Sequence, residues 1–180
     1  MIPLIKKTPA LQIVQSKIYT RETLLISLAI SHFKEHKIVF TNGCFDILHR
    51  GHIDYLAKAA DLGDELIIGV NTDASVKRLG KISSRPIQDE QSRLIILASL
   101  SFVTGIILFD EDTPLDLITL LRPDVLVKGA DYDANETDTK SKKYIVGSDI
   151  VRANKGEVKT IEFLEGYSTT TIENKILAVK

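Results

Sequence analysis

Residues 37–63 read KIVFTNGCFDILHRGHIDYLAKAADLG and combine a short apolar stretch, a polar turn and an amphipathic stretch. Lys37 to Thr41 predicts a buried strand that ends at Asn42-Gly43, because the run is short, largely apolar and followed by turn residues. From about Arg50 to Leu62 the apolar residues share one helical face, and Gly63 is a natural end for a helix. The stretch therefore predicts a strand–turn–helix unit.

The same alternation continues on both sides of this unit. Helices are expected at 20–36 with Thr20 as the cap, at 73–79, at 89–100, from Pro114 to before Pro123 with Thr113 as the cap, at 145–154 and from Ser168 onward. Strands are expected at 65–70, 103–109, 125–128 and 158–163. Apolar strands that alternate with helices predict the α/β class, with a parallel sheet that carries helices on both faces. Residues 1–19 show no firm pattern and are expected to form an N-terminal arm, and residues 20–180 a single domain.

Composition and charge limit the classes of function. The 180 residues include 23 basic and 24 acidic side chains, and the formal charge of −1 argues against binding nucleic acid through bulk charge. Cys44 is the only cysteine, which excludes an internal disulfide and a CxxC zinc site. The longest uncharged run, 94–109, would span about 24 Å as a helix, less than the roughly 30 Å of a bilayer core. With no signal peptide evident, the protein is expected to be soluble and cytoplasmic, without membrane contact.

The turn after the first strand of this unit carries the sharpest chemical signal. It runs from Thr41 to His52 and holds two histidines, His49 and His52, three residues apart. If the following helix begins near His49, both imidazoles lie on one face beside unpaired amides and the positive end of the helix dipole, which suits phosphate. Two solvated histidines on an exposed turn are the simpler interpretation, and a metal site is weaker because no third ligand is near in the sequence.

A second candidate anion site lies near the C-terminus. Ser168, Thr169 and Thr170 stand at a predicted helix start, where hydroxyls and backbone amides converge. An ordinary helix cap is the alternative. Lys128 ends a predicted strand before Gly129, where it either neutralises a phosphate or remains a surface lysine.

The segment Thr-x-Gly-x-Phe-Asp-x-x-His-x-Gly-His at residues 41–52 resembles the signature of the cytidylyltransferase-like nucleotidyltransferases, and so implies a Rossmann-like fold. The resemblance continues in Asn71-Thr72-Asp73, Ser84-Arg85-Pro86, Lys128-Gly129-Ala130-Asp131-Tyr132 and Glu165-Gly166-Tyr167-Ser168-Thr169-Thr170. It is strongest to the adenylyltransferase domain that makes ADP-heptose from heptose 1-phosphate. In many relatives that domain is fused to a sugar kinase, which this chain is too short to contain, so a stand-alone version is expected.

The resemblance also implies roles for individual residues. His49, His52 and Lys128 are the expected catalytic residues, because they would stabilise the charge that develops on the triphosphate. The residues expected to bind the nucleotide are Thr41, Asn42, Gly43, Cys44, Phe45, Gly51, Asn71, Asp73, Lys77, Lys81, Ser168, Thr169 and Thr170. The residues expected to bind the acceptor substrate are Asp46, Arg93 and Asp131.

Several of these roles have alternatives. Arg93 could form a structural ion pair instead, and Asp46 could orient a histidine. Lys77 and Lys81 could belong to a solvated basic stretch. Cys44 is interpreted as a small buried residue rather than a nucleophile, since the pattern places no base for it.

The expected reaction is the transfer of AMP from ATP to a sugar 1-phosphate, with release of pyrophosphate. Heptose 1-phosphate is the leading acceptor, and Mg²⁺ is expected to arrive with the nucleotide rather than in a cage of protein carboxylates. A glycerol-phosphate-type cytidylyltransferase that uses CTP is the closest alternative, and a nucleotide-binding module without turnover is another. Relatives suggest a homodimer.

Overall fold

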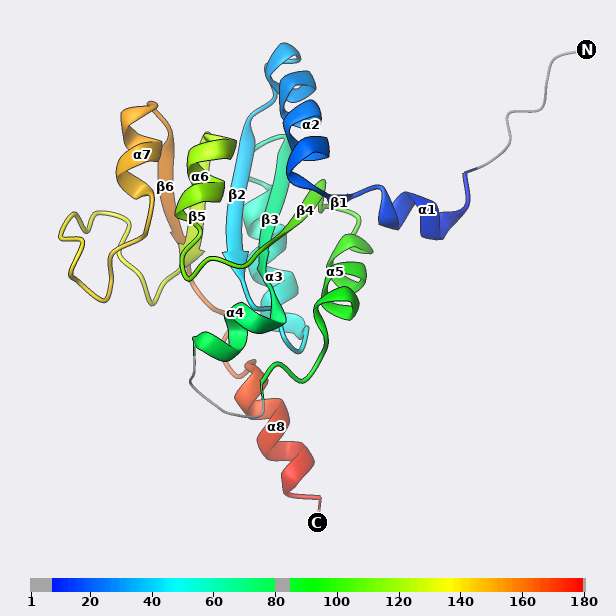
Figure 1. Ribbon diagram of the computed structural model, residues 1–180. Coiled ribbons are helices and arrows are strands. Elements are labelled where there is room, and N and C mark those ends of the chain that lie inside the picture. Colours follow the sequence, from blue (N-terminus) through cyan, green and yellow to red (C-terminus); the bar gives the residue numbers. More distant parts are fainter. Residues whose placement is uncertain (1–7, 80–84, 180) are drawn as a thin grey trace, which may run out of the picture.

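The computed structural model describes residues 8–79 and 85–179 and contains a six-stranded, wholly parallel sheet (Figure 1). The strands are β1 (Ile18–Tyr19), β2 (Ile38–Gly43), β3 (Glu65–Asn71), β4 (Gly105–Phe109), β5 (Val125–Gly129) and β6 (Glu157–Ile161), in the order β1-β4-β3-β2-β5-β6. The helices are α1 (Ala10–Gln15), α2 (Arg21–Phe33), α3 (Arg50–Ala60), α4 (Asp73–Arg78), α5 (Glu90–Ala98), α6 (Leu115–Leu121), α7 (Ser148–Ala153) and α8 (Thr169–Leu177). The prediction of an α/β fold with a parallel sheet is confirmed.

Two hydrophobic clusters cover the two faces of the sheet. Successive residues of a strand point to opposite faces, so Phe40 of β2 packs with the cluster that includes α2, α6 and α7, and Val39 packs with the cluster that includes α3 and α5. In Figure 1, α2 and α6 lie in front of the sheet and α3 lies behind it. The uninterrupted apolar strands are thus explained by burial on both sides, as predicted.

The winding direction of the sheet reverses between β2 and β5. From β2 the strands β3, β4 and β1 follow on one side, and β5 and β6 lie on the other. Val39 therefore stands opposite Val125, and Phe40 opposite Leu126. At such a switch point the turns that follow the two neighbouring strands separate and leave a crevice at the carboxyl ends of the strands.

Several helix starts agree with the sequence, and two differ. The Thr20 hydroxyl accepts the N–H of Thr23 at the start of α2, as predicted. The prediction that Thr113 caps α6 is wrong, because Pro114 holds the cap position and no described side chain caps that helix. The helix predicted at 145–154 is shorter, since Gly147 adopts a φ of 81° and α7 begins only after it.

The N-terminal segment belongs in part to the sheet. All six residues of α1 remain at least partly exposed, and the helix projects from the body as an arm would (Figure 1). Ile18 and Tyr19, however, pair with Ile106 and Ile107 as the edge strand β1. The expectation of an unpatterned arm is therefore wrong for β1, since two residues are too few to show a periodic pattern. Within residues 8–79 and 85–179, the helices all lack the combination of length and apolar sequence that crossing a membrane requires.

Candidate active site

A cavity of about 850 Å³ lies at the carboxyl ends of β2 and β5. Its wall combines the turns after β2, β3, β4 and β5 with the segment that leads from β6 into α8. The predicted site residues that line it are Asn42, Gly43, Cys44, Phe45, His49, Gly51, His52, Asn71, Lys128, Asp131, Ser168 and Thr169. The two histidines and the Ser168 turn, which are far apart in the sequence, thus border one space.

The two histidines stand at the start of α3. His49 is the residue that caps the helix, and its Nδ1 accepts a hydrogen bond from the backbone N–H of His52 at 3.3 Å. The two rings stack with their centroids 3.8 Å apart, and the Phe45 ring meets the His52 ring edge-on at 5.3 Å. Because Nδ1 of His49 accepts, the proton of the neutral ring sits on Nε2, where it can donate to a ligand.

Both imidazoles are neutral at neutral pH. Burial, with a smaller contribution from the neighbouring His49 ring, lowers the pKa of His52 from 6.5 to about 4. Burial also lowers the pKa of His49. The site without ligand therefore offers N–H donors rather than fixed positive charges, and a bound phosphate would favour protonation of the rings.

Gly51 is required by close packing between α3 and the segment before α8. A Cβ added at residue 51 would lie 3.1 Å from the His49 ring and 3.1 Å from the Cβ of Tyr167. Contacts that short are tighter than most side-chain packing. A larger residue would therefore require His49 or Tyr167 to shift, at the place where the histidine turn meets the C-terminal segment that completes the cavity.

Lys128 ends β5 and is held by the end of β2. Its ammonium donates to the Asn42 side-chain oxygen at 2.6 Å and to the Asn42 carbonyl at 3.4 Å. Burial lowers the pKa of Lys128 to about 8, and the charge of Asp131 opposes this shift. The lysine therefore carries its positive charge at pH 7, and Asn42 both lines the cavity and positions that charge.

A hydroxyl-bearing turn faces the histidines. Ser168 caps α8, its Oγ accepting the N–H of Thr171 at 3.0 Å and lying 2.8 Å from the Thr171 hydroxyl oxygen. Ser168, Thr169 and Thr171 line the cavity, whereas the exposed Thr170 lies outside the wall that the described residues form. The prediction for Thr170 therefore lacks support, and the sequence reasoning missed Thr171. The i, i+3 spacing from the cap was the available signal for Thr171.

Other predicted nucleotide-binding residues stand apart from the cavity wall in the described structure. The Thr41 hydroxyl lies 2.7 Å from the buried Tyr55 hydroxyl, which donates to the Val127 carbonyl at 3.2 Å. Thr41 thus ties β2 to α3 in the core. Lys77 lies on α4, outside the described cavity wall, and Lys81 lies outside the described residues.

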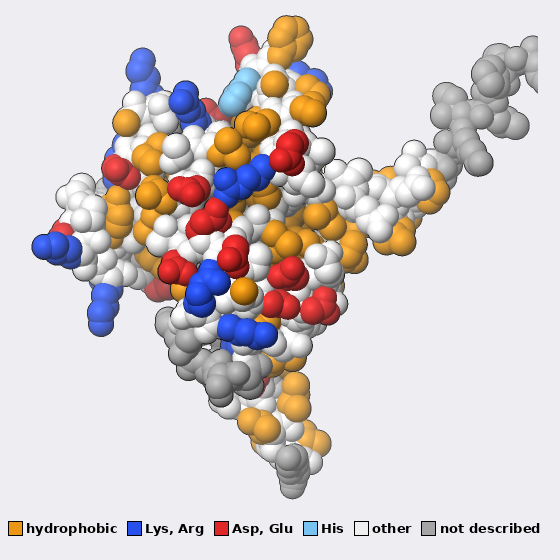
Figure 2. Space-filling model, in the orientation of Figure 1, with side chains coloured by type: hydrophobic (Ala, Val, Ile, Leu, Met, Phe, Trp, Pro, Cys, Tyr) orange, Lys and Arg blue, Asp and Glu red, His pale blue; other side chains and the backbone are white. Residues whose placement is uncertain are grey.

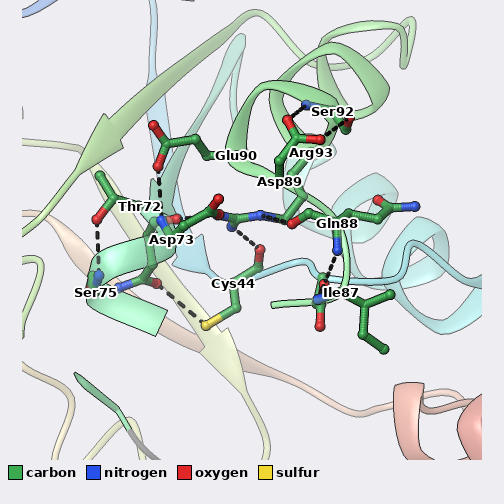
Figure 3. A network of polar contacts seen from close by, with 12 residues as sticks. Cys44, Thr72, Asp73, Ser75, Ile87, Gln88, Asp89, Glu90, Ser92 and Arg93 are labelled. Carbon is green, nitrogen blue, oxygen red and sulfur yellow. Dashed lines mark hydrogen bonds and ion pairs between the residues drawn. The ribbon is translucent and has the colours of Figure 1, made fainter. Parts of the chain in front are cut away.

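Arg93 joins the turns that form the site (Figure 3). Its guanidinium, which is 0% exposed, donates to the carbonyls of Cys44 at 2.6 Å, Asn71 at 2.8 Å and Gln88 at 3.2 Å, and pairs with the Asp73 carboxylate at 2.7 Å. Both Arg93 and Asp73 lie outside the cavity wall of the described residues. The structure therefore favours the structural ion pair over substrate binding for Arg93, and it gives Asp73 a partner other than the nucleotide.

Asp46 also has a structural partner. It is 3% exposed, and its Oδ1 accepts the N–H groups of Ile87 at 2.8 Å and Gln88 at 3.0 Å. Its Oδ2 is buried and lacks a hydrogen-bond partner among the described residues. Asp46 lies outside the described cavity wall and anchors residues 87–88, and its predicted contact with the acceptor stays a prediction.

The cavity also contains aromatic residues that the sequence reasoning did not assign. These are Tyr55, Phe109, Tyr132, Phe163 and Tyr167. Aromatic side chains have no spacing of their own that distinguishes a site from a core, and only Tyr132 and Tyr167 fall inside recognised motifs. Their rings offer flat apolar surfaces for a base or a sugar.

Residues 40–175 match the sequence pattern of the family described as cytidylyltransferase-like. The chain belongs to the cytidylyltransferase-like family. It is 53% identical over 151 residues to the "Bifunctional protein HldE" of Campylobacter concisus, covering 84% of this chain and 29% of that protein. It is 49% identical over 162 residues to the protein of the same name from Syntrophotalea carbinolica, covering 90% of this chain and 31% of that protein. The chain thus spans about 30% of the length of these two relatives.

Two solved structures share the fold of this chain. A lipopolysaccharide core biosynthesis protein from Thermoplasma volcanium matches with a TM-score of 0.54 and 32% identity, over 74% of this chain and 99% of that one. A pantoate-beta-alanine ligase from Francisella tularensis, complexed with beta-gamma ATP and beta-alanine, matches with a TM-score of 0.56 and 18% identity, over 89% of this chain and 77% of that one. The second match shows the fold alone.

The side chains that line the cavity indicate how a metal ion would be held there. Among the described residues, the structure gathers no group of three or more His, Cys, Asp or Glu side chains that could hold a metal ion. The wall carries three carboxylates, Asp112, Asp131 and Glu165, which do not gather into one such group, and Asp131 lies near Lys128. Such a wall fits Mg²⁺ that keeps its phosphate and water ligands better than Mg²⁺ in a protein cage.

Proposed function

We propose that this chain transfers AMP from ATP to a sugar 1-phosphate, with heptose 1-phosphate as the leading acceptor, and releases pyrophosphate. The observation that carries the proposal is the convergence of His49, His52, Lys128 and the Ser168 turn on one cavity at the switch point. Support comes from the resemblance of the motifs to ADP-heptose-forming adenylyltransferase domains and from the HldE relatives.

The chemistry requires little from a general base. A phosphate oxygen of the sugar 1-phosphate attacks the α-phosphorus of ATP and forms a new P–O bond. The bond from the α-phosphorus to the bridging oxygen breaks in line, and pyrophosphate leaves with its electrons. Because the attacking group is already an anion at neutral pH, rate enhancement rests on positioning and on stabilising charge.

The residues divide that work by their charge. His49 and His52 donate N–H groups to phosphate oxygens and can gain protons as negative charge develops. Lys128 supplies a positive charge fixed by Asn42. Ser168, Thr169 and Thr171 offer hydroxyls at the start of α8, where the first amides of a helix lack partners within the helix. Mg²⁺ enters as part of the ATP substrate and neutralises phosphate charge.

A matrix of substrates tests the proposal. ATP, CTP, GTP and UTP are each combined with heptose 1-phosphate, glucose 1-phosphate and glycerol 3-phosphate, and pyrophosphate release is measured. The expected result is turnover with ATP and heptose 1-phosphate above all other pairs. A preference for CTP with glycerol 3-phosphate would instead establish the cytidylyltransferase alternative.

A neutral control variant and an inactivating variant complete the test. His32 is exposed on α2, so His32→Ala should leave turnover unchanged, whereas Lys128→Met should abolish most of it. If the protein binds ATP but releases no pyrophosphate with any acceptor, it is a nucleotide-binding module. The relatives also suggest a homodimer, and the sequence pattern suggests a cytoplasmic location; light scattering of the purified protein tests the first, and cell fractionation the second.

A further inference from the structure

Helix α8 carries part of the phosphate site but is not anchored by the hydrophobic core. Its first turn contributes Thr169 and Thr171 to the cavity wall. Every described residue of the helix remains at least partly exposed, and Ile176 and Leu177 are each 64% exposed. Figure 1 shows α8 extending away from the sheet, and Figure 2 shows its apolar side chains on the protruding tip. Something other than core packing must therefore fix its first turn.

An ion pair ties α8 to the body of the protein. The Glu173 carboxylate lies 2.6 Å from the Arg85 guanidinium, and the two side chains are 20% and 22% exposed. Among the described residues, it is the one hydrogen bond between a side chain of α8 and any segment before residue 168. A pair that is mostly shielded from water interacts more strongly than an exposed surface pair.

Arg85 is itself connected to the histidine turn. Two and three residues further along, the N–H groups of Ile87 and Gln88 donate to Asp46, which lies in the turn between β2 and His49. The Gln88 carbonyl accepts from Arg93, which also holds the Cys44 carbonyl of that turn (Figure 3). The described contacts thus form a continuous path from α8, through residues 85–88, to the base of the histidine site.

We propose that Arg85 and Glu173 are positioning residues, which hold the Ser168 turn at its working distance from His49 and His52. The proposal rests on the proposed function only for the identity of the ligand, a nucleoside triphosphate. A second contact limits the effect of losing the pair, since Arg50 donates to the Tyr167 hydroxyl at 3.1 Å just before α8. Breaking the Arg85–Glu173 pair therefore loosens the turn without unfolding the core.

Charge reversal tests this role. Glu173→Lys and Arg85→Glu are each expected to weaken ATP binding about tenfold, a loss of about 1.4 kcal/mol. The KM for ATP should rise by a similar factor while kcat changes less, because the chemical groups themselves remain. The double reversal restores an opposite-charge pair and should bring ATP affinity back to within about threefold of wild type. Lys175→Glu, an exposed change on the same helix, is the matched control and should leave ATP affinity unchanged.

Hydrogen exchange without nucleotide provides a readout that does not depend on the activity. Amides of residues 168–177 should exchange faster in both single variants and return to the wild-type rate in the double variant, with thermal unfolding midpoints of all variants close to wild type. Unchanged exchange and ATP affinity in the single variants would overturn the proposal, as would impaired single variants that the double reversal does not rescue. If wild-type protein fails to bind ATP, the proposed function fails, while the exchange data still decide whether the pair positions α8.

Discussion

Burial sets the chemistry of the individual residues in the site. Among the basic side chains of the cavity wall, two have large pKa shifts toward the neutral form: the pKa of His52 falls to about 4 and that of Lys128 falls to about 8. Both shifts arise first from desolvation, and an anionic ligand opposes both. The two histidines are therefore arranged to gain positive charge when phosphate arrives, whereas Lys128 already carries its charge at pH 7.

His52→Ala separates catalysis from binding. The change removes one donor at the reacting phosphate and should lower kcat by about two to four orders of magnitude. ATP affinity should stay within a few-fold of wild type, because Lys128 and the Ser168 turn remain. Pyrophosphate release and calorimetry measure the two quantities, and a variant with wild-type turnover would contradict the role of His52.

The shifted pKa of His52 also makes stability depend on pH. In the unfolded chain the imidazole titrates near 6.5, whereas in the folded protein it titrates near 4. Between these values the unfolded state binds the proton more readily, so the free energy of unfolding of the nucleotide-free protein should fall as pH drops from about 6.5 to about 4. Urea titrations across this range measure the slope. His52→Gln should flatten it, and an equally steep slope in the variant would assign it to other groups.

Lys128 predicts the alkaline limb of the activity profile. Its pKa of about 8 means that the free enzyme loses this charge as pH rises through that value, so kcat/KM should decline above about pH 8. Lys128→Arg keeps its charge to higher pH and should move the decline upward, at a lower absolute rate because the guanidinium has a different shape. A decline at the same pH in both proteins would point to a different group.

Membership of the site was predictable from the sequence for residues that a regular spacing marks. It was not predictable for residues whose partners come together only in the folded chain. The histidine pair and the Ser168 cap are legible in the sequence because their members are three residues apart. The contacts that Arg93 and Asp46 make in the structure were not predictable, because most of their partners are backbone carbonyls and amides, which every residue carries. Only the folded sheet brings those backbone groups within reach.

At the scale of elements, Arg93 is the main brace between turns. Arg93→Met would leave the Asp73 carboxylate and three backbone carbonyls without this donor and should cost about 3–5 kcal/mol in the free energy of unfolding. Arg93→Lys should also destabilise, since one ammonium cannot reproduce the forked geometry. Equilibrium unfolding in urea measures the loss. Arg78→Met, on the surface of α4, is the control and should have little effect, and equal losses at the two positions would contradict the brace.

The order and type of most elements followed from their apolar patterns, and the exceptions have local causes. The strands of the sheet interior are long enough to show their character, whereas β1 has only two residues. Thr113 was a sound candidate for a cap by composition. Pro114 took that position instead, so the Thr113 side chain borders the cavity.

For the whole molecule, the switch point predicts which segments respond to ligand. Residues 42–52, 128–132 and 166–171 border one cavity although they are distant in sequence. ATP should therefore slow amide exchange in all three segments together and leave α7, which packs on the side of β6, unchanged. Hydrogen exchange with and without ATP measures this. Protection confined to one of the three segments would contradict a shared site.

The shortness of β1 has a consequence for how the protein behaves at high concentration. A sheet exposes unpaired backbone groups along its two outer margins, where a foreign chain can add itself. One margin here offers only Ile18 and Tyr19. The opposite margin, β6, presents Glu157 and Lys159, and Glu157 also pairs with Lys37. Neither edge strand offers another copy of the chain a long, uncharged edge to pair with, so this sheet is poorly suited to edge-to-edge aggregation.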